Sequence, residues 1–187
     1  MHMSKAESIM LNSNSLVLKE LRSTDVTQQY VDWLNNPKIN QYLESRFTLQ
    51  DKYKVKEFVR NCKQSDLCFL FGVFTAGNMK HIGNIKLGPI NLNHNYAEIG
   101  IIIGDIDSWG MGFASKAISM VTHFGFYQLK LFKISAGCYE NNIGSKKAFE
   151  KSGYQVEGFL ANQVESANGR EGIWRLGCFK DNFNSVG

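Results

Sequence analysis

The stretch that decides the fold is Asp107-Ser108-Trp109-Gly110-Met111-Gly112-Phe113-Ala114. It follows an apolar, isoleucine-rich segment and precedes one in which small and apolar residues recur at helical spacing: Ala114, Ala117, Ile118, Val121, Phe124 and Gly125. Glycine lacks a Cβ, so the backbone here can approach a ligand closely. The free N–H groups of the helix's first turn favour an anion. The pattern therefore predicts a strand, a turn that cradles a phosphate or pyrophosphate, and a helix.

Two familiar phosphate-binding loops do not fit this stretch. No Gly-Lys-Ser/Thr follows Gly112, so it is not a P-loop. The third glycine of the dinucleotide fingerprint is missing, and the unit comes late in a chain that opens with a helical pair.

Working outward, the hydrophobic periodicity predicts further strands and helices on both sides. We expect strands at 16–21, 68–74, 81–87, 96–104, 132–139, 154–159 and 173–179, and helices at 26–34, from Thr48 and Asp51 to about 61, from 112 onward, and at 143–152. Residues 89–95 are expected to form a loop, and a turn at Asn168-Gly169 joins the last two strands. The order predicts an α/β (α+β) domain whose sheet has about seven strands and is flanked by helices.

The composition sets limits on the class of protein. The chain has 187 residues, of which 43% are hydrophobic and 20% charged. These values predict a single domain over 15–182, with a disordered or tag-derived segment at 1–14 and a tail at 183–187. No apolar run reaches the length of a membrane span, and no secretory leader is evident. We therefore expect a cytoplasmic protein without a membrane partner.

The charge and the positions of the cysteines and histidines limit the kinds of ligand that we expect. The net charge is +4, and no basic run exceeds two residues, so a nucleic-acid partner is not expected. The four cysteines form no C-x-x-C pair, and the four histidines lack metal-ligand spacing. We expect no metal and cysteines that stay reduced in the core.

A second motif is Tyr139-Glu140-Asn141-Asn142-Ile143-Gly144-Ser145-Lys146-Lys147-Ala148-Phe149-Glu150-Lys151-Ser152-Gly153-Tyr154. Together the two motifs resemble the GNAT superfamily of acetyl-CoA-dependent N-acetyltransferases, in particular the branch of the ribosomal-protein and spermidine acetyltransferases. The resemblance covers about 16–180. It implies a mixed, mostly antiparallel sheet in which a splayed strand pair holds coenzyme A, with acetyl-CoA as the only cofactor.

The resemblance also implies which residues bind the cofactor. The pyrophosphate would be held by Trp109, Gly110, Met111, Gly112, Phe113 and Ala114. The pantetheine arm would pair with the backbone near Ile102 and Ile103, and Asn142 and Ser145 would contact it from the following helix. Family members usually carry Gln or Arg where this chain has Asp107, so one favourable contact is absent.

Acetyl transfer needs a neutral amine, and alkyl amines are mostly protonated at pH 7. Glu98 is the candidate base, because it is the charged residue in an otherwise apolar strand; the alternative is a solvated charge at a strand end. Many family members place a Tyr acid where this chain has Phe149, which has no proton to give. Tyr139 is the nearest substitute. The alternatives are that Tyr139 is a core residue, and that the thiolate leaves unassisted or through water.

The acceptor side is expected from the N-terminal helices and the last strands, with Glu44, Arg46 and Trp174-Arg175 as candidates. Arg46 would suit a phosphate or carboxylate of the acceptor, or else caps a surface helix. The stretches 33–37 and 44–47 resemble family members associated with amino-sugar synthesis.

The expected activity is acetyl transfer to a primary amine, such as a nucleotide-linked amino sugar or a protein N-terminus; a polyamine fits the positive net charge less well. The alternative is a catalytically silent coenzyme A-binding module, which Phe149 and Asp107 favour. The apolar strands near the C-terminus would suit a homodimer.

Overall fold

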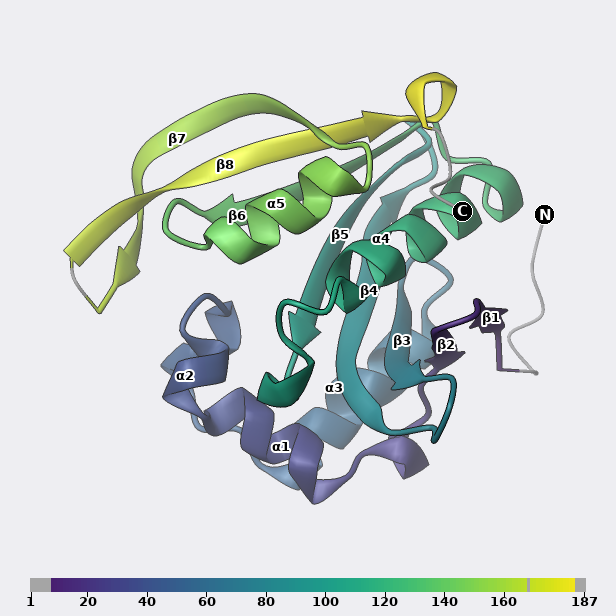
Figure 1. The fold of residues 1–187 in the computed structure, drawn as a ribbon, viewed down its shortest axis with the longest axis vertical. Helices are drawn as coiled ribbons and strands as arrows, with labels where there is room; N and C mark the ends of the chain where they lie inside the picture. Colours follow the sequence, from purple (N-terminus) through teal and green to yellow (C-terminus); the bar gives the residue numbers. More distant parts are fainter. Residues whose placement is uncertain (1–7, 168, 184–187) are drawn as a thin grey trace.

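The computed structural model describes residues 8–167 and 169–183, which form one eight-stranded sheet with helices packed on it (Figure 1). The strands are β1 (Met10–Asn12), β2 (Leu16–Glu20), β3 (Phe69–Thr75), β4 (His81–Asn91), β5 (Tyr96–Ile103), β6 (Lys133–Tyr139), β7 (Gln155–Ser166) and β8 (Gly169–Phe179). The helices are α1 (Gln28–Asn35), α2 (Pro37–Asn40), α3 (Lys52–Gln64), α4 (Phe113–His123) and α5 (Ile143–Lys151), with a short 3₁₀ turn, η2 (Glu44–Phe47).

The sheet order is β1-β2-β3-β4-β5-β6-β8-β7. Every described pairing is antiparallel except that of β5 with β6, which the crossover through α4 makes parallel. The prediction of a mixed, mostly antiparallel sheet flanked by helices is thus confirmed.

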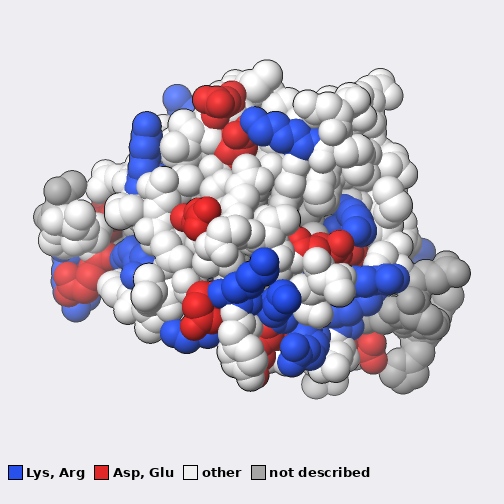
Figure 2. Space-filling view, turned by 90° about the horizontal axis from the view of Figure 1, so that it is seen from below, with Lys and Arg blue, Asp and Glu red and all other residues white. Residues whose placement is uncertain are grey.

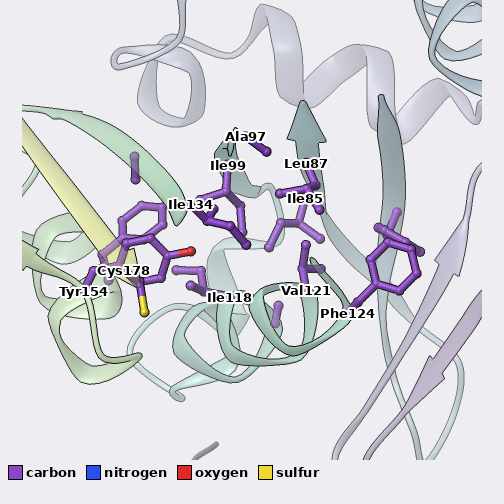
Figure 3. Packing of buried hydrophobic residues seen from close by; sticks show 14 of the residues in the cluster. Ile85, Leu87, Ala97, Ile99, Ile118, Val121, Phe124, Ile134, Tyr154 and Cys178 are labelled. Atoms are coloured by element: carbon purple, nitrogen blue, oxygen red, sulfur yellow. The ribbon is translucent and has the colours of Figure 1, made fainter. Parts of the chain in front are cut away.

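The two faces of the sheet bury different helices, because successive side chains of a strand point to opposite faces. Ile118, Val121 and Phe124 pack against Ile85 and Ile99 in the main core (Figure 3). The opposite face holds a smaller cluster in which residues of α1 and α3, such as Trp33 and Val59, surround Leu70. Strand β5 therefore presents Ala97 and Ile99 to the main core and Glu98, Gly100 and Ile102 to the other side.

Several boundaries differ from the sequence prediction. The prediction of a disordered or tag-derived segment over 1–14 is wrong about disorder at Met10–Asn12, which pairs with β2 as an eighth strand. Residues 1–7 lie outside the described part. Phe183, expected in the tail, is 5% exposed and packs on Phe126 in the main core. A three-residue strand and a single buried phenylalanine are too short to show a hydrophobic period, so local periodicity does not reveal them.

Two other expectations are also corrected. Strand β4 continues through Pro89, where a break in register with β5 lets a residue without an N–H stay in the sheet. The last two strands form a long hairpin, with Val164 paired to Glu171, where a loop was expected. The turn at 168 itself lies outside the described residues.

The sheet opens between its two halves. Strands β5 and β6 pair only from Tyr96 to Glu98, opposite Lys133 to Ser135, whereas β4 and β5 pair along most of their length. Figure 1 shows β6, β8 and β7 running away from the ends of β4 and β5 beyond this point. The backbone of β5 after Glu98 therefore has no described partner strand on this side, and an extended ligand can pair with it.

Candidate active site

The cradle lies at the N-terminus of α4. Gly110 and Gly112 have φ of 76° and 80°, a left-handed conformation in which side chains are strained. A Cβ built on either glycine would meet no described atom within 4 Å, so a side chain would extend into open space in front of the helix. Gly112 is the N-cap of α4, and Lys116 N is the donor to its carbonyl. The N–H groups of the first turn therefore remain available to an anion, as expected for a pyrophosphate site.

Trp109 ties the cradle to the open strand. Its indole N–H donates to Ile103 O at 2.8 Å, across the end of β5, while the ring is 42% exposed. Met111 is more exposed, at 63%. The Trp109 side chain fixes the loop to β5. The Trp109 backbone N–H already donates to Ile106 O at 3.0 Å, so this predicted pyrophosphate donor is engaged within the loop.

One cavity of about 1150 Å³ joins the cradle to the open strand pair. Its described lining includes Trp109, Gly110, Gly112, Phe113 and Ala114 from the cradle, Ile102 and Ile103 from β5, Asn142 and Ser145 from α5, and Glu98 and Tyr139. Most of the sequence-predicted residues are thus brought together around one space. Met111 lines a separate hollow next to the β1–β2 turn.

Asn142 has a second role that the sequence did not indicate. It is the N-cap of α5, and its Oδ1 accepts a hydrogen bond from Ser145 N at 3.2 Å. This leaves the side-chain Nδ2 as the donor that Asn142 can offer to a ligand.

Glu98 lies where β5 and β6 begin to separate. Its Oε1 accepts hydrogen bonds from Arg175 Nη2 at 2.7 Å and from Tyr96 Oη at 3.0 Å. Burial by itself raises the pKa of the carboxyl, but the hydrogen bonds from Arg175 and Tyr96 outweigh it and hold the pKa below its usual range. The carboxylate is therefore ionised at neutral pH and fixed in place.

A glycine on β6 leaves room for this arrangement. Gly137 of β6 is paired with Arg175 of β8, and a Cβ on Gly137 would lie 3.1 Å from Arg175 Nη1. Because Gly137 has no Cβ, the Arg175 guanidinium passes across β6 and reaches Glu98 on β5. Sequence reasoning named neither Gly137 nor Tyr96 as a site residue. The available signal was a glycine inside an apolar strand, which often marks a close approach.

The Tyr139 hydroxyl is already engaged. It donates to Glu44 Oε1 in a short hydrogen bond and accepts one from Arg46 Nη1 at 2.9 Å. Burial and the bond to Glu44 raise its pKa, against the opposing effect of Arg46. A raised pKa makes the hydroxyl a weaker proton donor.

The position that usually carries the acid is apolar here. Phe149 is 1% exposed, packs on Tyr154 at 5.1 Å between ring centroids and also lines the cavity. Cys138 lines the same space, and burial raises its pKa to about 11, so its thiol stays protonated at neutral pH.

The two predicted acceptor residues are placed differently. Glu44 lines the cavity, whereas Arg46 is not among the described residues that do so. The Arg46 guanidinium donates to Leu43 O and to Glu165 O as well as to Tyr139. Arg46 therefore already joins three segments of the chain.

The face that carries α1 and α3 has Lys and Arg side chains interspersed with Asp and Glu (Figure 2). Among the described residues, no group of His, Cys, Asp and Glu has the arrangement of a metal site. Within the same part of the chain, each helix is too short or too polar to span a bilayer.

Comparison with known proteins identifies the family and the fold of the chain. The family described as acetyltransferase (GNAT) domain matches residues 15–155. The chain is 30% identical over 155 residues to an uncharacterized N-acetyltransferase, p20, of Bacillus licheniformis, covering 81% of this chain and 83% of that protein. It is 31% identical over 112 residues to the probable N-acetyltransferase YjcK of Bacillus subtilis, and this match spans 59% of each protein.

Solved structures share the fold. Spermidine N-acetyltransferase from Vibrio cholerae, in complex with CoA and spermine, superposes with a TM-score of 0.82 at 24% identity, covering 91% of this chain and 98% of that one. A GNAT-family acetyltransferase from Bacillus anthracis gives 0.79 at 19% identity, covering 92% and 99%. The chain belongs to the GNAT family of acetyltransferases. It is accordingly an acetyl-CoA-dependent N-acetyltransferase.

Proposed function

We propose that this protein transfers the acetyl group of acetyl-CoA to a primary amine at the point where β5 and β6 separate, with Glu98 as the base. The observation that carries the proposal is the single cavity that joins the Gly110–Gly112 cradle, the unpaired stretch of β5 and the Glu98 carboxylate. Each of these features meets a different need of the reaction, and all three face the same space.

The residues at the cofactor end bind and orient. Acetyl-CoA, when bound, supplies the thioester whose carbonyl the amine attacks. In the proposed arrangement, the first-turn amides of α4 hold the pyrophosphate, and the backbone of Ile102 and Ile103 pairs with the pantetheine. The Asn142 Nδ2 and the Ser145 side chain are the polar contacts from α5. A backbone N–H of β5 is the donor that stabilises negative charge on the carbonyl oxygen.

The residues at the acceptor end handle the proton. An alkyl amine with a pKa of about 10 arrives mostly as an ammonium ion, which the ionised Glu98 attracts. Glu98 accepts a proton from the ammonium ion, directly or through a water molecule, and the neutral amine then attacks the thioester carbonyl. The nitrogen loses its second proton to solvent as the C–N bond forms and the C–S bond breaks. Arg175 lowers the pKa of Glu98, so Glu98 attracts the ammonium ion well but is a weak base. Glu98 therefore releases the proton to solvent afterwards.

Protonation of the leaving thiolate has two candidate sources. Tyr139 lines the cavity and carries a hydroxyl, but Glu44 and Arg46 already hold that hydroxyl. Phe149 offers no proton. A water molecule is the source that needs no rearrangement of these bonds, and we assign the proton to it.

The acceptor candidates are a nucleotide-linked amino sugar and a protein N-terminus. The resemblance in fold to spermidine N-acetyltransferase adds a polyamine to the candidates. Release of thiol from acetyl-CoA, measured against a panel holding all three classes, tests the proposal. We expect turnover with at least one class at a rate above acetyl-CoA hydrolysis.

Tight coenzyme A binding without turnover of any amine would contradict the proposal. It would support the second candidate function, a silent coenzyme A-binding module, which the apolar Phe149 favours. In that case the Phe149→Tyr variant would show whether a proton donor at this position restores transfer.

A further inference from the structure

The segment that follows α2 crosses the acceptor side of the cavity. We call residues 42–46 the strap; Tyr42, Leu43, Glu44 and Ser45 line the same cavity as Glu98 and Arg175. In Figure 1 the strap lies between α1 and the ends of β6 and β7. Residues of β5, β6 and β8 supply another part of the lining.

Side-chain hydrogen bonds join the strap to segments that are remote in sequence. Tyr42 Oη donates to Asn141 O at 3.2 Å, and Tyr139 Oη donates to Glu44. Arg46 donates to Tyr139 Oη at 2.9 Å and to Glu165 O at 2.5 Å. These bonds join the strap to the end of β6, to the β6–α5 turn and to β7.

Hydrogen bonds also connect the strap to α1. Asn35 of α1 exchanges hydrogen bonds with the backbone of Gln50 at 2.8 and 2.9 Å. The Gln50 side chain donates to Ser45 O at 3.1 Å. The strap is therefore bonded to β6 and β7 and, through Gln50, to α1.

Burial contributes little to holding this segment. None of the residues of η2 is buried, and Phe47 is 62% exposed. A segment without buried apolar side chains opens at low free-energy cost unless specific bonds hold it. Arg46 makes the largest share of those bonds, and its guanidinium also lies 4.2 Å from the centre of the Phe47 ring.

We infer that the strap closes the acceptor end and that Arg46 is the specificity-determining residue that keeps it closed, so that the acceptor is a small free amine and not the N-terminus of a folded protein or peptide. This inference rests on the proposed acetyl transfer. A peptide acceptor would extend beyond the cavity, and its chain would have to run where the Tyr42–Asn141 and Arg46–Glu165 hydrogen bonds lie. A compact amine requires no such passage.

The test compares two acceptors in the parent and in the Arg46→Gln variant. One acceptor is the small amine from the panel that is turned over fastest, and the other is a tetrapeptide with a free N-terminus. The parent should prefer the small amine. Arg46→Gln should raise kcat/KM for the peptide at least about tenfold in absolute terms, because a steric exclusion has been removed. Arg60→Gln, which removes the same charge from the exposed side of α3, should change neither value.

A parent that acetylates the peptide as efficiently as the small amine would overturn the inference and leave the proposed acetyl transfer standing. So would an Arg46→Gln variant with no gain toward the peptide. If no amine of either size is acetylated, the proposed function fails, and hydrogen exchange then decides about the strap. Backbone amides at 43–48 should exchange faster in Arg46→Gln than in the parent or in Arg60→Gln; equal rates would show that Arg46 does not hold the strap.

Discussion

The two ends of the active-site cavity are formed by different kinds of groups, backbone amides at one end and side chains at the other. At the proposed cofactor end, the phosphate cradle consists of backbone amides and two glycines within one short stretch, Gly110–Ala114, and its geometry follows from the start of a helix. The acceptor end consists of side chains from the strap, β5, β6 and β8, joined by hydrogen bonds such as Glu98–Arg175 and Arg46–Tyr139.

This difference has a consequence for substitution. Backbone donors at a helix start serve any pyrophosphate and tolerate changes in most neighbouring side chains. A network of side chains depends on each member, so one substitution changes the pKa, the position or the access that the others provide. We therefore expect changes at the cofactor end to affect binding of coenzyme A, and changes at the acceptor end to affect rate, pH dependence and selectivity.

The largest effect is expected from Gly112→Asp. A side chain at φ of 80° is strained, and its negative charge would face the pyrophosphate. Coenzyme A should bind about 100-fold more weakly, which corresponds to about 2.7 kcal/mol. Isothermal titration calorimetry measures this directly. Gly77→Asp is the matched control, because Gly77 lies in the turn before β4 with open space around it. A Gly112→Asp variant that binds coenzyme A as the parent does would remove the cradle from the site.

Glu98→Gln is expected to have the next largest effect, and on rate alone. An amide cannot accept the proton, so kcat should fall by about 10²- to 10⁴-fold while the Kd for coenzyme A stays unchanged. Steady-state kinetics with the best amine of the panel gives kcat, and isothermal titration calorimetry gives the Kd for coenzyme A. Glu57→Gln on the exposed side of α3 controls for the lost charge. An unchanged kcat would mean that Glu98 is only a structural partner of Arg175.

Arg175→Met should shift the pH profile. Burial raises the pKa of Glu98 and the hydrogen bond from Arg175 lowers it, so without Arg175 the pKa rises. Activity, which needs ionised Glu98, is then lost at a higher pH, so the acid limb of the profile moves to higher pH. The pH dependence of kcat/KM measures the shift, and Arg170→Met on the exposed hairpin is the control. An acid limb that stays in place would show that another group controls it.

The same pair affects stability in a defined direction. A carboxyl with a lowered pKa stabilises the folded state above its unfolded pKa, and this contribution is lost as the pH falls through the folded pKa. Because the side chains of Glu98 and Arg175 are 42% and 36% exposed, screening limits the contribution to about 1 kcal/mol or less.

Tyr139→Phe should have the smallest effect on rate. If the hydroxyl only tethers the strap, kcat for a small amine should change by less than about threefold, well below the 10²-fold typical of a lost acid. Steady-state kinetics at several pH values distinguishes the two roles. A fall of about 100-fold would instead make Tyr139 the proton donor, a role that Phe149 cannot fill.

The sequence predicted the sheet's central elements because they are long and strongly periodic. The isoleucine run of β5 and the regular apolar spacing of α4 are examples. It missed β1 because a three-residue strand is too short to show a period, and it missed the continuation of β4 because a proline usually marks the end of a strand. The helix expected from Thr48 begins at Lys52, because Asp51 and not Thr48 accepts the hydrogen bond from the first turn.

The sequence by itself determined the proposed phosphate cradle, since two glycines before a helix fix the backbone locally and the free amides of a helix start need no distant partner. Only the tertiary structure decided the acceptor end. Whether Glu98 is a free base or the partner of Arg175 depends on Gly137 leaving room between two other strands. Whether Arg46 binds a substrate or closes the cavity depends on Tyr139 and Glu165, which lie 93 and 119 residues away in the chain. Such contacts are set by how strands and loops pack, and short-range sequence patterns do not encode them.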